Sequence, residues 1–362
     1  MKKILLYLFI GTSFITQSCI NDNEDPVAIS KIEGSIVNPT VGGPTQPNQV
    51  WFDLGTDSEV LTKRTDWDLA LYSGSNFKVI LNSSLMMAAG KIPNATNIDL
   101  VTEAEVSGLQ DLVQVANFNP SNTIYIDDVK GNFPSGYTAI EEINPNESEN
   151  AVYLLNMGKG IYTGNVPAGS VTTAGENRGW MKIQISRTSN GGYKIKYAPL
   201  NSASHKELTI NKNSAYNYNF VSLKNEKELL IQPEKKKWDL CFSVFTNTIT
   251  GAGSYVYADF ITINNVGGAG AYEVKASGTT TGVEAYNNFK VSDIDQSKFI
   301  YNDQRVIGGN WREVGPSGYQ VKGDVFYVIK DPDGYYFKLR FTRLTSSSGE
   351  RGYPQFEYKP LF

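Results

Sequence analysis

The chain of 362 residues contains one histidine and two cysteines. A serine hydrolase needs a histidine to take the proton of its nucleophile, and His205 lies in a polar stretch rather than at a strand-to-helix turn. A zinc site needs several histidine or cysteine ligands at close spacing, which this chain cannot supply. Only Cys241 follows Cys19, so no disulfide framework is expected within the folded part. The fold must be held by its core, and the protein is not expected to be an enzyme.

The chain also lacks a block of basic residues. It has 33 lysines and arginines against 37 aspartates and glutamates, a net charge of −4. Removal of a leader that carries Lys2 and Lys3 leaves 31 basic residues against 37 acidic ones, hence −6. Phosphate neutralisation supplies most of the affinity for nucleic acid, so nucleic acid is excluded as a partner.

The sequence has no apolar run long enough to cross a bilayer. The longest, from Ile4 to Phe14, follows two lysines and falls short of the ~20 residues that a membrane-spanning helix needs. A basic start and a short apolar middle are typical of a signal peptide. Ser18 and Cys19 then resemble a lipobox, although Thr16 stands where leucine is usual.

These features predict a lipoprotein signal peptide over residues 1–18 and a fatty-acylated Cys19. The acidic, asparagine-rich segment that follows predicts a flexible tether over residues 19–44. Acidic residues directly after the lipidated cysteine resemble the signal that sends lipoproteins of the Bacteroidetes to the outer face of the outer membrane. We therefore expect a lipid-anchored, surface-exposed protein of the outer membrane.

The remainder of the chain contains one pattern twice. Trp67-Asp68-Leu69 is repeated as Trp238-Asp239-Leu240, and a Pro-Ser-Gly-Tyr sequence follows each of them. Each half then has an apolar strand, an alternating strand and a closing Tyr-x-Pro-Leu. Four signals in the same order indicate an internal duplication. We place copy one at residues 45–200, a linker at 201–212 and copy two at 213–362.

The secondary-structure signals favour an all-β fold with minor helix. Short alternating segments rich in Tyr, Phe, Val and Ile are separated by Gly, Asn, Asp and Ser turns, which is typical of antiparallel sheets. The two strands around Met181–Ile185 and Phe337–Phe341 carry apolar residues on one face and polar residues on the other. The best helix candidate begins at Thr102, where Thr102 and Glu105 form a capping-box pattern.

The Trp-Asp-Leu motifs have a structural interpretation. Each tryptophan is expected to anchor a core, and each aspartate is expected to cap a turn or to accept backbone hydrogen bonds.

Candidate ligand residues follow these motifs in both copies. Copy one has Met86 and Met87 there, and copy two has Tyr255 and Tyr257 in a glycine-rich insertion. These polarizable and aromatic groups suit a flat apolar ligand. The alternative is that they pack in the core or within loops.

Copy two resembles a known family. Trp238–Phe242, Asp324–Ile329 and Asp333–Phe341 are similar to the HmuY haem-binding lipoproteins of the Bacteroidetes, and copy one is similar more faintly. The resemblance implies two tandem HmuY-like antiparallel β units. It also implies haem capture and delivery to a TonB-dependent receptor, with the iron held by axial side chains from the loops after the Trp-Asp strand. Neither copy has a histidine there, so Met86, Met87, Tyr255 and Tyr257 are the candidates in this chain.

Two other functions remain open at this stage. Exposed tyrosine and tryptophan side chains could form a stacking platform in a glycan-binding or adhesion lipoprotein that does not bind haem. Loop carboxylates could hydrolyse glycosides, but the sequence cannot place two of them at the required separation.

Overall fold

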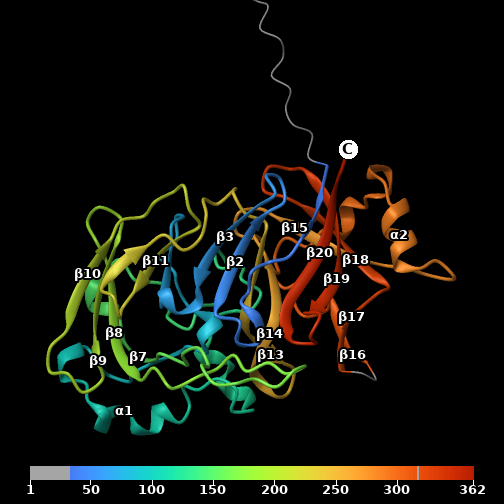
Figure 1. Cartoon of the computed structure of the whole chain (residues 1–362). Coiled ribbons are helices and arrows are strands. Elements are labelled where there is room, and N and C mark those ends of the chain that lie inside the picture. Colours follow the sequence, from blue (N-terminus) through green and yellow to red (C-terminus); the bar gives the residue numbers. More distant parts are fainter. Residues whose placement is uncertain (1–32, 316–317) are drawn as a thin grey trace, which may run out of the picture. The chain divides into compact units, whose positions relative to one another are not determined.

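The computed structural model of the chain describes residues 33–315 and 318–362, and antiparallel strands dominate this part. This finding confirms the all-β prediction. Two sheets have five strands, two have four, and one is a two-stranded ribbon (Figure 1). In spatial order they are β1 (Ser35–Val37), β20 (Arg351–Leu361), β19 (Tyr336–Thr345), β18 (Val325–Lys330) and β15 (Gly270–Lys275); β10 (Lys206–Ile210), β9 (Tyr193–Pro199), β8 (Trp180–Arg187), β7 (Val152–Asn156) and β6 (Ala88–Lys91); β12 (Lys227–Leu229), β11 (Tyr218–Ser222), β4 (Leu69–Tyr72) and β5 (Val79–Leu81); β14 (Gly253–Ile263), β13 (Leu240–Ile249), β2 (Asn48–Asp53) and β3 (Ser58–Lys63); and β16 (Arg312–Gly315) with β17 (Gly318–Val321).

The helices in the described part are short. The predicted helix is α1 (Glu103–Gln110), and its capping box is formed because Glu105 accepts a hydrogen bond from the Thr102 backbone at 2.7 Å. A second helix, α2 (Gly282–Asn288), begins with the same Thr-x-x-Glu signature, which the sequence analysis overlooked. The short 3₁₀ helices are η1 (Gly43–Thr45), η2 (Arg64–Asp66), η3 (Ser83–Leu85), η4 (Ile98–Leu100), η5 (Pro120–Tyr125), η6 (Glu147–Glu149), η7 (Val291–Asp293) and η8 (Gln296–Lys298).

The two copies exchange their first strands. The hairpin β2–β3, which begins copy one, pairs through β2 with β13 of copy two. The hairpin β11–β12, which begins copy two, pairs through β11 with β4 of copy one. The strands before these hairpins follow them, since β1 pairs with β20 and β10 pairs with β9. Each copy's sheets are therefore completed by the other copy.

Two spatial modules result from this exchange. Module one contains β4 to β12 and is continuous over residues 64–232. Module two contains β1 to β3 together with β13 to β20, so its described residues are 33–63, 233–315 and 318–362. Figure 1 shows β7 to β10 at one side and β18 to β20 at the other, with β2, β3 and β11 between them.

The aspartates of the two Trp-Asp-Leu motifs hold the exchanged hairpins. Asp68 Oδ2 accepts a hydrogen bond from the Leu223 backbone at 2.7 Å. Asp239 Oδ2 accepts one from the Leu54 backbone, also at 2.7 Å. Both carboxylates are buried, so loss of either would leave a backbone N–H unpaired at a cost of about 1–3 kcal/mol. The predicted role of these aspartates as acceptors of backbone hydrogen bonds is confirmed.

The tryptophans of the same motifs pack on the exchanged hairpins. Trp67 meets Phe220 edge to face with ring centroids 4.9 Å apart, and Trp238 meets Trp51 in the same way at 4.8 Å. All four side chains belong to one buried cluster that joins the two modules. The prediction that each tryptophan anchors a core is confirmed, but the core is one that both copies share.

Each module has three layers. In module one, Tyr153 and Leu155 of β7 face the core between the two sheets, whereas Val152 and Leu154 face a second apolar cluster beneath α1. Module two repeats this arrangement, because alternate residues of β18 face the inter-sheet core and a cluster beneath α2. Helix and loop segments thus cover the outer face of each five-stranded sheet.

This covering explains two residues that the sequence analysis placed on a polar face. Lys182 and Lys338 lie on the alternating strands β8 and β19 as predicted, yet both are buried. Lys182 Nζ donates to the carbonyl oxygens of Val101 and Ser202, each at 2.6 Å. Lys338 Nζ donates to Tyr286 O at 2.6 Å, at the end of α2. Burial lowers the pKa of both lysines.

The structure differs from expectation at two segments. Residues 33–44, expected to belong to the tether, contain β1 on the edge of a five-stranded sheet. Residues 201–212, expected to be a linker, contain β10 on the edge of the other five-stranded sheet. Short polar edge strands lack the apolar alternation that identifies a central strand, which explains why both were overlooked.

The exchange predicts which fragment of the chain can fold alone. We expect residues 64–232 to form a monomer that unfolds cooperatively in urea, because this fragment keeps both sheets and the core of module one. Residues 45–200 lack β10 to β12 and carry an unpaired hairpin, so they should aggregate or form dimers. Light scattering and urea titration of both fragments provide the test. A cooperatively folded monomer of residues 45–200 would contradict the exchange.

Candidate functional site

The predicted glycine-rich loop of copy two is a hairpin rather than a loop. Residues 247–249 end β13 and residues 253–257 begin β14, with Gly253 at a positive φ of 92° after the turn. The expectation of a loop did not account for the alternation of Tyr255, Val256 and Tyr257, which suits an exposed strand. The tyrosines are therefore held on a regular sheet.

Tyr255 and Tyr257 form an aromatic patch with Phe118. The rings of Tyr255 and Tyr257 are 5.2 Å apart, and Phe118 lies 6.2 Å from Tyr255. Phe118 is 63% exposed and Tyr255 39% exposed. Residues one position apart on a strand point to opposite faces, so the two tyrosines share a face that Val256 does not. The patch can stack against a flat ligand.

A groove of about 540 Å³ lies next to this patch. Its volume falls within the range of small-molecule sites in proteins. Tyr257, Phe260, Ile300 and Val306 supply apolar or aromatic walls. The segment that closes the groove is attached to β14 through Gly308, which exchanges two backbone hydrogen bonds with Ile261.

Arg305 is the basic residue among the described residues that line the groove. Its guanidinium group makes bidentate contacts with Asp303 at 2.9 and 2.8 Å and donates to Asn247 Oδ1 at 2.9 Å. The hydrogen bond from Asp303 raises the pKa of Arg305, which keeps it charged. Glu273 adds a second carboxylate to the lining. The groove thus offers an aromatic wall, a phenol and a fixed cation with nearby acids.

The methionines predicted for copy one lie elsewhere. Met87 is 1% exposed and belongs to the core of module one. Met86 is half-buried, adopts a positive φ of 63° at the end of η3 and packs against the cluster that contains Val256. The structure therefore brings Tyr255 and Tyr257 together, but it does not place Met86 or Met87 on their face of β14.

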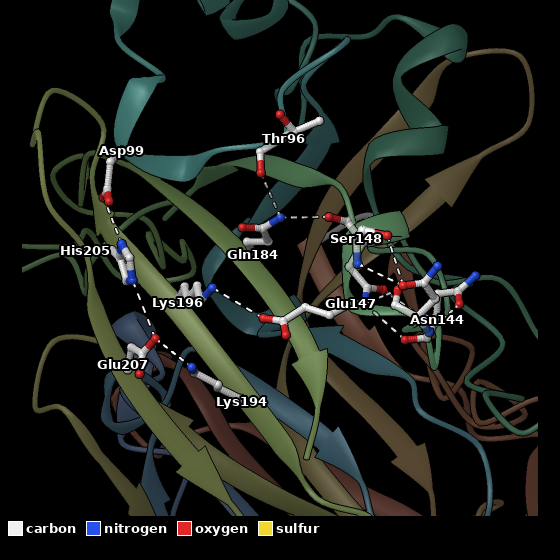
Figure 2. Close-up of polar contacts among 12 residues, drawn as sticks. Thr96, Asp99, Asn144, Glu147, Ser148, Gln184, Lys194, Lys196, His205 and Glu207 are labelled. Atoms are coloured by element: carbon white, nitrogen blue, oxygen red, sulfur yellow. Dashed lines mark hydrogen bonds and ion pairs between the residues drawn. The ribbon is translucent and has the colours of Figure 1, made fainter. Parts of the chain in front are cut away.

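The single histidine stabilises the edge strand β10. His205 Nδ1 lies 2.8 Å from Asp99 Oδ1, and its Nε2 lies 3.6 Å from Glu207 Oε1 (Figure 2). Lys194 of β9 pairs with the same Glu207 at 2.8 Å. Figure 2 shows this row of charges along β9 and β10, with Lys196 and Glu147 beside it. These contacts attach β10 to η4 and to its neighbouring strand.

Residues 33–315 and 318–362 contain no group of three or more His, Cys, Asp or Glu side chains arranged to hold a metal ion. None of the helices in these residues has the length and apolar character required to cross a membrane. Cys19, the predicted lipidation site, lies outside the described residues.

Two residues of this site were missed from the sequence. Phe118 and Arg305 lie in irregular segments with no periodic pattern, far from the Trp-Asp-Leu motifs. Only the pairing of the 303–310 segment with β14 and the ring contact with Tyr255 bring them to the patch. Asn247, by contrast, was recognised within the insertion.

The fold defines an all-β protein built from two copies of one unit that share their sheets and a central aromatic cluster. A family model described as HmuY protein matches the chain twice, over residues 45–217 and 211–358. The two matches together span most of the chain, and the chain belongs to the HmuY family. The resemblance and the tandem duplication inferred from the sequence are confirmed.

Several solved structures are similar to this chain. A candidate HmuY-like heme-binding protein from Bacteroides vulgatus is 17% identical, covers 40% of this chain and 85% of its own, and has a TM-score of 0.22. Apo PinO from Porphyromonas gingivitis is 15% identical, with 44% and 86% covered and a TM-score of 0.22. A candidate lipoprotein from Bacteroides fragilis is 13% identical, with 48% and 94% covered and a TM-score of 0.20. None of the curated proteins compared with the chain matches it.

Burial separates core residues from ligand candidates in a way that stability measurements can test. We expect Met87→Ala to lower the free energy of unfolding by about 2–5 kcal/mol, because it empties a packed core position. Met86→Ala should cost less, since that side chain is only half-buried. Tyr257→Phe should change stability by about 0.5 kcal/mol or less, as it removes a hydroxyl at the surface. Urea unfolding without ligand measures all three, and a neutral Met87→Ala would contradict the core assignment.

Proposed function

We propose that this protein is a surface-exposed outer-membrane lipoprotein that binds haem or a related ligand for uptake through a TonB-dependent receptor. The observation that carries the proposal is the match of the HmuY family to both copies. Binding rather than catalysis is proposed, because the histidine is committed to the edge of a sheet and the groove presents a phenol and a cation.

The groove next to the aromatic patch is the proposed ligand site. Its apolar walls and volume suit a flat ring system. A tyrosine oxygen can ligate haem iron, and Tyr257 is the candidate residue that lines the groove. Arg305 can face a carboxylate of the ligand while Asp303 and Asn247 hold its orientation. Met87 is too deeply buried to serve without local rearrangement, so copy two is proposed as the main binding copy.

The anchor follows from the N-terminal sequence. A signal peptide over residues 1–18, acylation of Cys19 and the acidic segment after it would hold the folded part at the outer face of the outer membrane. This location gives access to ligands outside the cell and to a receptor in the same membrane.

Haem titration tests the ligand. The mature protein, beginning after Cys19, should shift the haem absorption band at micromolar concentrations. Tyr257→Phe should weaken binding about tenfold or more, because it removes the proposed axial oxygen. Tyr335→Phe is the matched control, since Tyr335 is an exposed tyrosine in the turn between β18 and β19.

No spectral shift at micromolar haem would overturn the haem assignment. The exposed patch of Phe118, Tyr255 and Tyr257 then favours the glycan-binding alternative, because aromatic side chains at a surface stack against sugar rings. A glycan array with a specific hit that Tyr255→Ala abolishes, together with the absent haem shift, would establish that function.

Replacement of Cys19 tests the anchor. Wild-type protein should partition with the outer membrane and be removed from intact cells by added protease. Cys19→Ala should leave the membrane fraction, because its acylation site is gone. Cys241→Ala is the matched control, since Cys241 is a buried free thiol in the folded part. Wild-type protein that resists protease on intact cells would contradict surface display.

A further inference from the structure

A second cavity lies between the two modules and is distinct from the groove. It has a volume of about 110 Å³. Trp51, Trp67, Trp238, Phe133 and Phe220 line it, and all five belong to the cluster that joins the modules. For comparison, an apolar cavity of about 150 Å³ in another protein binds benzene. The space is thus sufficient for a small organic molecule or several waters.

The walls of this cavity break the symmetry between the copies. Trp67 Nε1 donates a hydrogen bond to Gln49 Oε1 at 2.7 Å across the interface. The exchanged hairpins pair with the Trp-Asp-Leu strands in the same register, which puts Tyr218 where Gln49 lies in the other half. Trp238 therefore has no corresponding acceptor, and its buried Nε1 lacks a hydrogen-bond partner.

Two more polar atoms of the lining have no partner. Gln232 Oε1 and Ser243 Oγ are both buried without a hydrogen bond. Gln232 is 6% exposed, Ser243 8% and Trp238 5%. Buried polar atoms without partners are uncommon and each costs about 1–3 kcal/mol, so three in one cavity indicate a molecule that supplies the missing hydrogen bonds.

The charge of the lining is negative. Asp127 and Asp128 contribute carboxylates, and no lysine, arginine or histidine is present among the described residues that line the cavity. The two oxygens of Asp127 accept hydrogen bonds from the backbones of Leu81 and Ala139 at 2.6 and 2.9 Å. Burial nevertheless raises the pKa of Asp127 to about 7, since no cation offsets the loss of water. Aromatic walls with carboxylates form an environment that favours organic cations.

We propose that this cavity binds a small hydroxylated ammonium compound of the size of choline. Its cationic end faces the aromatic rings and Asp127, where cation–π and ionic attraction add. Its hydroxyl group accepts a hydrogen bond from Trp238 Nε1 and donates to Gln232 or Ser243. The site exists only where the copies meet, and it is independent of the haem groove.

Choline and its neutral carbon isostere, 3,3-dimethylbutan-1-ol, test the proposal on the mature protein. Three of the five tryptophans line the cavity, so choline should change the intrinsic fluorescence in a saturable manner. We expect half-saturation at about 1 mM or below. The isostere has the same shape and hydroxyl group but no charge, and it should bind at least about tenfold more weakly. Calorimetry confirms each affinity.

Two variants assign the binding to the cavity. Asp127→Asn and Ser243→Ala should each weaken choline binding several-fold, and Ser243→Ala is conservative enough to keep the fold. Asp111→Asn is the control for the charge change, because Asp111 is exposed at the end of α1. Trp180→Phe is the control for fluorescence, because Trp180 lies on β8 outside the cavity lining.

Three outcomes would overturn the proposal. These are the absence of saturable choline binding up to about 10 mM, equal affinity for the neutral isostere, and choline affinity that Asp127→Asn and Ser243→Ala leave unchanged. A failed haem titration leaves the choline result unaffected, because the two measurements concern different sites and different signals.

Discussion

The architecture depends on a carboxylate that lies in one copy and holds the backbone of the other. Asp68 and Asp239 follow the two anchoring tryptophans, and each accepts a buried N–H group from the hairpin that the opposite copy supplies. Without this contact the hairpins would have no fixed position, and each four-stranded sheet would lose two strands. The duplication is therefore a condition for closing the sheets, in addition to a record of ancestry.

The two equivalent carboxylates have different electrostatic surroundings. Asp68 pairs with Arg178 at 2.6 Å, whereas Asp239 forms no ion pair with the described residues and lies near Asp53, Asp331 and Asp333. Burial raises the pKa of Asp239 well above its ordinary value. The hydrogen-bond geometry has thus been kept in both copies while the charges around it have changed. The same divergence separates Gln49 from Tyr218 at the cavity.

Sequence patterns identified the parts of this fold but not how they connect. The Thr102 capping box, the turn at Asp331–Gly334 and the two alternating strands were all predictable, because each depends on neighbours within about ten residues. The hairpin exchange was not predictable, since β2 has the same apolar pattern whichever Trp-Asp-Leu strand it joins. The burial of Lys182 and Lys338 was hidden for a related reason: alternation shows two faces but not what covers them.

The candidate sites follow the same division. Tyr255 and Tyr257 were identified because they lie directly after a recognisable motif, whereas Arg305 depends on a contact that only the folded chain makes. The inter-module cavity lies beyond any local pattern, since its walls come from both copies.

Linking the copies in one chain makes the exchange favourable. A hairpin swapped between separate chains must overcome the entropy of association, whereas a tethered hairpin acts at an effective concentration of about millimolar or above. The linked copies are also free to diverge, because a change in one is not imposed on the other as it is in a symmetric dimer. Tyr218 opposite Trp238 is such a change: a homodimer would place the same residue at both positions, and either both indoles or neither would have a partner. A single polar cavity with one free indole N–H is therefore a consequence of tandem duplication within one chain.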